Sequence, residues 1–346
     1  MLFKVLGKKE FTTFIELLLN DTEVIAPKQV GVDTSGKPLH QYLPVQAFTE
    51  IDLSYETTEY SAKTYFLPFR ENLSTCSFLD MVWDRQIKYR VQPRAIIGLH
   101  ACDINALLKL DKVLAGDRFP SPYYISRRKN TFIVGIDHDP CEGGFCQAVG
   151  ADVVTHGFDL YLTDLEDRYF VAINSERGFN VLQRVKTREP TARDNNDYLD
   201  VRRRIAGQFK PLEVHNLPNL MDIEFESKVW KKWADKCLSC GSCAMVCPTC
   251  YCYGIEERVS MDNAESAKVK QLYSCQFLDF AMVAGGHNFR PDRETRLKYR
   301  YYHQHRGFVE AYEEPLCVGC YRCGRVCLAG INPTDIIGDL QTEYQE

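Results

Sequence analysis

Two cysteine runs constrain the fold of this chain more than any other feature. They span residues 237–247 and 317–327, and both have the spacing C-x2-C-x2-C-x3-C. This spacing is typical of a loop that surrounds a [4Fe–4S] cluster, and in two-cluster proteins the fourth cysteine of each run binds the other cluster. The sequence therefore predicts one cluster on Cys237, Cys240, Cys243 and Cys327, and a second on Cys317, Cys320, Cys323 and Cys247.

Zinc and disulfide bonds are the alternative uses of so many cysteines. A structural zinc ion takes four ligands, usually from two C-x2-C pairs that stand well apart, which these two compact runs do not resemble. Structural disulfides need an oxidising compartment. The N-terminal segment has neither the long apolar region nor the cleavage site of a signal peptide, and we find no apolar stretch long enough for a membrane span. We expect a cytoplasmic iron–sulfur protein.

The composition is that of an ordinary globular protein, and the length suggests two domains. The 346 residues are 45% hydrophobic and 26% charged, with a net charge of −5. That acidic balance provides no general attraction to nucleic acid or to anionic membranes. No G-x-G-x-x-G motif occurs, so a Rossmann-type nicotinamide or flavin site within this chain is not expected.

The first domain is predicted to be an α/β domain of residues 1–217, including a C-terminal linker. Residues 8–19 have apolar side chains at helical spacing. Residues 95–99 and 131–136 are apolar strand segments on either side of a helix, which predicts a β–α–β unit. Residues 157–164 and 168–173 predict two further strands. We expect Asp103 to cap the helix of residues 104–114, which would place Cys102 at the positive end of the helix dipole.

The second domain is predicted to be an α-helical, di-cluster ferredoxin-like domain of residues 218–346, which makes the fold class α+β. About seventy residues separate the two cysteine runs, far more than the short loop of a small ferredoxin. We interpret that insert as two helices, of residues 265–283 and 293–306. Trp230 and Trp233 lie on one helix face, where packing is the expected role.

A basic segment within this insert suggests a rival function of another class. Basic residues interleaved with aromatic ones can follow single-stranded nucleic acid. The alternative is a helix that packs on the cluster domain and offsets the negative charge of thiolate-ligated clusters, which we favour because the chain as a whole is acidic. The basic residues are Arg290, Arg293, Arg296, Lys298, Arg300 and Arg306.

Several motifs taken together resemble one known family. Pro248-Thr-Cys-Tyr-Cys252 follows the first cysteine run, and Ser274-Cys-Gln-Phe and Ala284-Gly-Gly-His-Asn-Phe-Arg290 come after it. The front half contributes His100-Ala-Cys-Asp and Gly157-Phe-Asp-Leu. With these motifs, nearly the whole chain resembles a family that includes the iron–sulfur β subunits of soluble NiFe sulfhydrogenases and the corresponding iron–sulfur subunits of anaerobic sulfite reductases.

The resemblance implies an electron-transfer subunit within a hetero-oligomer, with no catalytic site of its own. Such a subunit relays single electrons between a flavin- and NAD(P)-binding partner subunit and a catalytic oxidoreductase subunit. The Gly157-Phe-Asp-Leu stretch favours a NiFe hydrogenase as that catalytic partner, and a sirohaem sulfite reductase is the alternative.

The second cysteine run departs from the usual pattern. Leu328 follows Cys327 where proline is common, and Tyr321 stands at a position often taken by glycine. Arg322 and Arg325 place positive charge beside this run. Because cations favour the reduced, more negative cluster, we expect the second cluster to have the higher potential of the two.

Seven cysteines lie outside the two runs: Cys76, Cys102, Cys141, Cys146, Cys250, Cys252 and Cys275. We hypothesise a third iron–sulfur cluster on Cys102, Cys146, Cys275 and one of Cys250 or Cys252, joining the two domains. The alternative is that these thiols are small buried hydrophobic groups. Spacing does not decide between the two, because ligands from distant segments cannot be paired by spacing alone.

Overall fold

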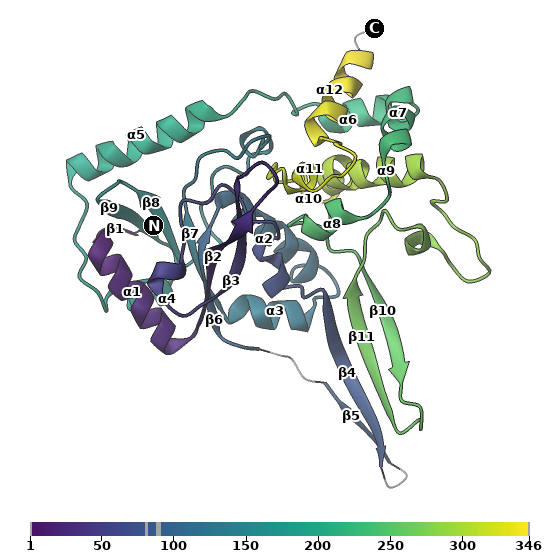
Figure 1. Ribbon diagram of the computed structural model, residues 1–346, viewed down its shortest axis with the longest axis horizontal. Coiled ribbons are helices and arrows are strands. Elements are labelled where there is room, and N and C mark those ends of the chain that lie inside the picture. Colours follow the sequence, from purple (N-terminus) through teal and green to yellow (C-terminus); the bar gives the residue numbers. More distant parts are fainter. Residues whose placement is uncertain (1, 80–81, 88–90, 345–346) are drawn as a thin grey trace.

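A computed structural model describes residues 2–79, 82–87 and 91–344 of the chain. It contains a large mixed sheet with helices on both faces, a second and smaller sheet, and a helical region near the C-terminus (Figure 1). The predicted α+β class is confirmed. Within the described residues, no helix combines the length and apolar character needed to cross a membrane.

The large sheet has seven strands in the order β1-β9-β8-β7-β6-β2-β3. Neighbours among β2, β6, β7 and β8 run parallel, and the remaining pairs are antiparallel. The predicted strands of the first domain are therefore present, and they meet in one sheet. Their bounds are β1 Leu2–Gly7, β2 Glu23–Val32, β3 Pro38–Val45, β6 Arg94–Leu99, β7 Thr131–Ile136, β8 Leu160–Asp164 and β9 Arg168–Ile173.

Helices bury apolar side chains against both faces of this sheet. On one face lie α1 (Lys8–Asp21) and α4 (Glu176–Leu182), with Phe14 and Leu182 in a core shared with the strands. The other face is covered by α2 (Ala101–Leu114) and α3 (Pro122–Lys129). Because β6 and β7 are parallel neighbours joined through α2 and α3, the predicted β–α–β unit is confirmed.

Helix α2 begins earlier than predicted. His100, not Asp103, occupies the N-cap, and the His100 carbonyl accepts from the backbone N–H groups of Asp103 and Ile104. The expected capping role of Asp103 is therefore wrong. Its carboxylate is instead 2.8 Å from the guanidinium of Arg322, a partner 219 residues away that sequence spacing could not suggest. Cys102 still lies in the first turn of the helix.

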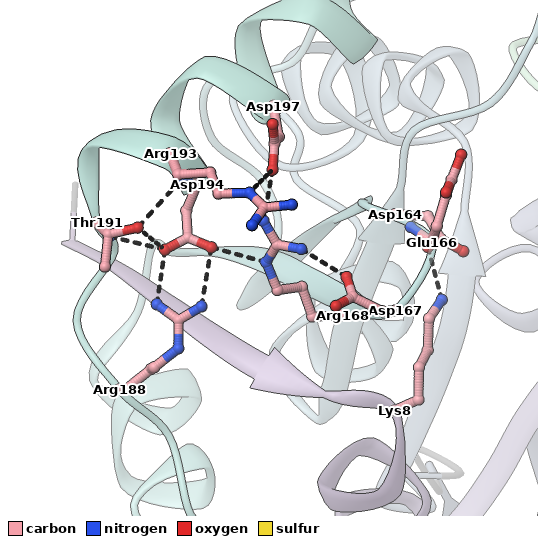
Figure 2. A network of polar contacts seen from close by, with 10 residues as sticks. All are labelled: Lys8, Asp164, Glu166, Asp167, Arg168, Arg188, Thr191, Arg193, Asp194 and Asp197. Carbon is pink, nitrogen blue, oxygen red and sulfur yellow. Dashed lines mark hydrogen bonds and ion pairs between the residues drawn. The ribbon is translucent and has the colours of Figure 1, made fainter.

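The long helix α5 (Ala192–Gln208) begins in a network of charged side chains (Figure 2). Thr191 and Asp194 form a reciprocal capping box, which satisfies backbone N–H groups at the helix start. The Asp194 carboxylate also accepts from Arg168 and Arg188, and its side chain is only 1% exposed. Hydrogen bonds from Arg188, the largest cause, hold the pKa of Asp194 well below its usual range. The network anchors α5 to the edge of the sheet.

The second sheet corrects the sequence interpretation of the insert. Its strands are β4 (Arg70–Leu79), β5 (Val82–Gln86), β10 (Tyr253–Val259) and β11 (Glu265–Leu272), in the order β10-β11-β4-β5. The predicted helix of residues 265–283 is therefore wrong, because residues 265–272 pair with β10 and β4 on either side. This sheet extends away from the body as an arm (Figure 1) and joins strands from both sides of the predicted boundary at residue 217.

The remaining C-terminal elements are helical and carry the two cysteine runs. Trp230 and Trp233 are buried there with Leu297 and Ile336, in the packing role expected of them. The predicted helix of residues 293–306 is present as α9 followed by a π-helical turn. The bounds are α6 Leu217–Ile223, α7 Lys228–Lys236, α8 Ser242–Val246, α9 Arg293–Tyr302, the π-helical turn His303–Gly307, α10 Phe308–Tyr312, α11 Arg322–Arg325 and α12 Pro333–Glu343.

Four short 3-10 helices complete the described secondary structure. One of them, Ala62–Tyr65, lies in the first half of the chain yet reaches the cysteine-rich region, because the buried Lys63 donates to carbonyls beside the first cysteine run. The others are Phe48–Glu50, Gln147–Val149 and Leu278–Ala281.

Candidate metal centre

Two cavities, each lined by cysteines from both runs, form the centre of the helical region. The first has about 550 Å³ of space and the second about 480 Å³, and both figures include space that is open to solvent. Arg300, Tyr301 and Cys323 line both cavities, so the two are neighbours. The first cavity is lined by Cys237, Cys240, Cys243 and Cys327 as well as Cys323, and the second by Cys247, Cys317, Cys320 and Cys323.

The fourth cysteine of each run thus faces the cavity of the other run. Cys327 lies with the first three cysteines of the first run, and Cys247 with those of the second. Crossed ligation of two clusters requires this placement.

The two cysteine loops share an unusual backbone conformation at matching positions. The second residue after the first cysteine has positive φ in both loops, at Ser239 (51°) and Gly319 (64°). The fourth residue does too, at Gly241 (80°) and Tyr321 (60°). Left-handed turns let three cysteines of one loop point to the same side. Tyr321 is the departure from the usual glycine, and a non-glycine residue in this conformation costs about 1–2 kcal/mol.

Backbone N–H groups point at several of the sulfur atoms. Ser239 N lies 3.4 Å from Cys237 Sγ, Gly319 N lies 3.4 Å from Cys317 Sγ, and Ile331 N lies 3.4 Å from Cys327 Sγ. Such hydrogen bonds stabilise the thiolate form, and those to cluster sulfurs tune the reduction potential.

Burial opposes ionisation of the free thiols. It raises the pKa of Cys243 and of Cys317 to about 12, whereas a hydrogen bond with Ser242 lowers the pKa of the exposed Cys240. Binding of iron displaces the thiol protons in any case, since the thiolate is the ligand.

Two buried cations beside these cavities have no carboxylate partner among the described residues. Lys63 is 3% exposed, and its ammonium donates to the carbonyls of Cys247 and Cys250. Arg300 is 7% exposed and donates to Cys243 O and Cys250 Sγ. Uncompensated buried charges cost several kcal/mol each. Thiolate-ligated clusters supply the missing negative charge, so the donor set and its surroundings fit iron–sulfur clusters.

A single metal ion fits less well than a cluster. Among the residues that the structure describes, no three His, Cys, Asp or Glu side chains are arranged as the ligand set of one ion. A [4Fe–4S] cluster binds one thiolate at each of its four iron corners, and its thiolates therefore stand farther apart than the ligands of a single zinc ion.

Comparison with known proteins agrees with this assignment. Residues 236–331 match the family model of a 4Fe-4S dicluster domain, which includes both cysteine runs. The chain is 34% identical to sulfhydrogenase 2 subunit beta of Pyrococcus furiosus over 306 residues, which are 87% of this chain and 89% of that protein. The chain belongs to the sulfhydrogenase β-subunit family. No solved structure matches it.

Membership of this family and the dicluster domain make the chain an iron–sulfur electron-transfer subunit. The family predicted from the sequence motifs is confirmed. The name of the P. furiosus relative makes that protein one subunit of a larger enzyme.

In this chain the second cysteine loop is packed against the α/β domain. Phe145 N donates to Gly319 O at 2.8 Å, and the Cys141 thiol lies 3.5 Å from Cys320 O. Arg322 is buried with Asp103, each 2% exposed, and their ion pair measures 2.8 Å.

This packing removes the argument for the higher potential of the second cluster. Arg322 is compensated by Asp103, and Arg325 lies 3.4 Å from a Glu56 carboxylate oxygen. Of the two cations that have no carboxylate partner among the described residues, Arg300 lines both cavities, and Lys63 donates to the carbonyl of Cys247. Because burial disfavours the more negative reduced cluster, we now expect the sheltered second cluster to have the lower potential.

The structure divides the cysteines of the hypothesised third cluster between two places. Cys102 and Cys146 contact each other and pack with Val318 and Cys320 near the second loop. Cys252 and Cys275 contact each other at the base of the β10–β11 hairpin, close to Arg300. Cys250 lies beside Cys247. A single set that combines Cys102 and Cys146 with Cys275 is not what this arrangement favours.

The basic segment turns inward instead of forming a surface stripe. Arg296 is 6% exposed and donates to backbone carbonyls of residues 290 and 291. The Arg290 guanidinium lies 3.4 Å from the Tyr299 ring centre, and Arg306 pairs with Asp222 at 2.7 Å. These contacts favour the packing role over a path for nucleic acid.

Proposed function

We propose that this protein relays single electrons between a flavin- and NAD(P)-binding partner subunit and a catalytic NiFe hydrogenase subunit. The observation that supports it best is the pair of neighbouring cavities, in which the fourth cysteine of each run lines the cavity of the other run. The sulfhydrogenase relative favours a hydrogenase as the catalytic partner.

In this proposal the eight motif cysteines are the ligands of two [4Fe–4S] clusters. Cys237, Cys240, Cys243 and Cys327 hold one, and Cys317, Cys320, Cys323 and Cys247 hold the other. When bound, such a cluster takes up and releases one electron at a time without any change in a substrate's bonds.

The residues around the clusters bind, shield and tune them. Backbone N–H groups of Ser239 and Gly319 donate to ligand sulfurs, and Arg300 places one positive charge next to both cavities. Leu238 (56% exposed) and Leu328 (84% exposed) line the first cavity at the surface. Electrons therefore cross to a partner at the first cavity, since the second is sheltered.

Anaerobic reduction of the purified chain tests this function. We expect dithionite to bleach the visible iron–sulfur absorption, and NADPH to have no effect until the flavin-containing partner subunit is added. A Cys243→Ser variant is the control for specific loss of one cluster. Reduction of the isolated chain by NADPH, with flavin bound to this chain, would contradict the proposal.

A further inference from the structure

Three cysteines outside the two runs gather at the base of the β10–β11 hairpin. Cys250 and Cys252 precede β10, and Cys275 follows β11. The two strand ends are held together by the pairing of Tyr253 with Leu272 and by a 2.9 Å hydrogen bond from Tyr273 N to Cys252 O. As a result Cys252 and Cys275 lie next to each other. The hairpin thus joins cysteines from separate segments.

Side-chain N–H donors point at two of these sulfur atoms. Arg300 Nη1 lies 3.3 Å from Cys250 Sγ, and Gln304 Nε2 lies 3.6 Å from the same atom. Gln276 Nε2 lies 3.9 Å from Cys275 Sγ. All three donors are buried, as are Cys250 (6% exposed) and Cys275 (4%). Buried N–H donors directed at sulfur suit thiolates better than neutral thiols.

Two buried cations lie beside these cysteines as well as beside the two dicluster cavities. Lys63 and Arg300 contact the same short segment, the ammonium at Cys250 O and the guanidinium at Cys250 Sγ. Neither has a carboxylate partner in the part of the chain that the structure describes, and both are at least nine-tenths buried. Thiolates at these cysteines would lie next to both cations.

We propose that Cys250, Cys252 and Cys275 hold a third iron–sulfur cluster, with Lys63 and Arg300 as its counter-ions. Three thiolates bind three iron corners, their three protons are released, and the fourth corner has no cysteine ligand. Thiolate sets select either iron–sulfur clusters or zinc. Direct contact between Cys250 and Cys247, a cysteine of the dicluster motif, favours iron–sulfur, because it places the site beside the proposed electron path.

This inference rests on the proposed iron–sulfur function and adds a site to it. It also differs from the ligand set hypothesised from the sequence, since Cys102 and Cys146 pack against Val318 and Cys320 of the second loop. Iron, sulfide and zinc are to be measured on the full chain, purified and reconstituted anaerobically. We expect about twelve irons per chain, or about eleven for a three-iron cluster, where two clusters alone give about eight.

Cysteine variants locate the third site. We expect Cys275→Ser and Cys252→Ser each to lose the extra three to four irons and to keep about eight. Cys76→Ser, at a half-buried cysteine of β4 outside all three sites, and Cys102→Ser should keep the wild-type content. Unchanged iron in Cys275→Ser, loss of iron in Cys102→Ser instead, or zinc in place of the extra iron would overturn the inference.

A measurement on the unmodified chain covers the case in which a variant does not fold. Quantified electron paramagnetic resonance of the fully reduced wild-type protein should give an integrated intensity above that of two clusters. In addition, Lys63→Gln should keep the full iron content and shift the midpoint potential of one cluster to a more negative value. A wild-type chain with about eight irons and two clusters refutes the third site alone. A content well below eight refutes the proposed function itself.

Discussion

The two cysteine loops have the same spacing and the same left-handed turns, yet they lie in opposite surroundings. Cys240 of the first loop is exposed, and Leu238 beside it is 56% exposed. Cys320, at the equivalent place in the second loop, is 8% exposed and lies under the α/β domain. In the proposed function the first loop would present its cluster to a partner subunit, and the second loop would hold its cluster inside the chain.

The second loop has a tyrosine where the first loop has a glycine, and this tyrosine contacts the α/β domain. Gly241 in the first loop adopts φ 80° without a side chain, whereas Tyr321 adopts φ 60° and packs its ring against Gly143 and Gly324. A hydrogen bond from its hydroxyl to Asn332 adds to this packing. Backbone strain in the second loop is thus offset by contacts that the first loop lacks.

Loss of a ligand should have the largest effect, and it should differ between the loops. We expect Cys240→Ser and Cys320→Ser each to lose about four irons per chain. Only Cys320→Ser should also lower the melting temperature strongly, because its cluster supports the contact with the α/β domain. Anaerobic melting and iron analysis of both variants check this, with Cys76→Ser as control. Equal melting temperatures of Cys240→Ser and Cys320→Ser would show that the second loop does not stabilise the contact between the helical region and the α/β domain.

Removal of the counter-ion of Arg322 should shift one potential and leave the other unchanged. In Asp103→Asn the buried guanidinium becomes uncompensated beside the second cluster. At an effective dielectric constant of about 20, one buried charge near a redox centre contributes on the order of 1–2 kcal/mol, or roughly 50–90 mV for one electron. We expect the second cluster to become easier to reduce by roughly this amount in a redox titration.

A matched variant separates this effect from general disturbance. Asp194→Asn also removes a buried carboxylate paired with arginines, but at the start of α5 among Arg168 and Arg188. It should leave both potentials in place. Equal shifts of both clusters in Asp103→Asn, at full iron content, would mean that Arg322 does not act on the second cluster alone.

The smallest expected effect concerns the left-handed turns. A Cβ at Gly241 would lie 2.5 Å from the Phe277 ring, so Gly241→Ala should cost about 1–3 kcal/mol of unfolding free energy. Tyr321→Ala keeps the strained backbone and loses the ring contacts. Tyr321→Gly should be more stable than Tyr321→Ala by about 1 kcal/mol, because only glycine adopts positive φ without strain. Anaerobic urea denaturation compares the three variants, and equal stability of the two Tyr321 variants would argue against strain.

Local sequence patterns were enough to predict β6, β7, β8 and β9 of the large sheet but not β1 or β3, and the crossed ligation of the motif cysteines stays a prediction. Apolar runs identify β6 and β7, since buried parallel strands are apolar along their length. The β11 strand, Glu265–Leu272, was missed because it contains Lys268, Lys270 and Gln271 and is stabilised by pairing with β4, far away in the sequence. Tertiary pairing there overrides local preference.

The same limit applies to the ligand set hypothesised for the third cluster. Cys252 and Cys275 meet only because β10 and β11 form a hairpin, so a helical interpretation of that segment could not bring them together. Lys63 approaches the site from the other half of the chain. Contacts of this kind carry no spacing signal, and so the sequence identifies the spare cysteines without showing which of them lie together.

The crossed ligation of the two clusters is the central claim, and Cys327→Ser tests it most directly. Cys327 belongs to the second run but lines the first cavity. A potentiometric titration followed by electron paramagnetic resonance identifies which cluster each variant changes. We predict that Cys327→Ser alters the same cluster as Cys240→Ser. If it alters the cluster that Cys320→Ser alters, each run holds its own cluster and the account is wrong.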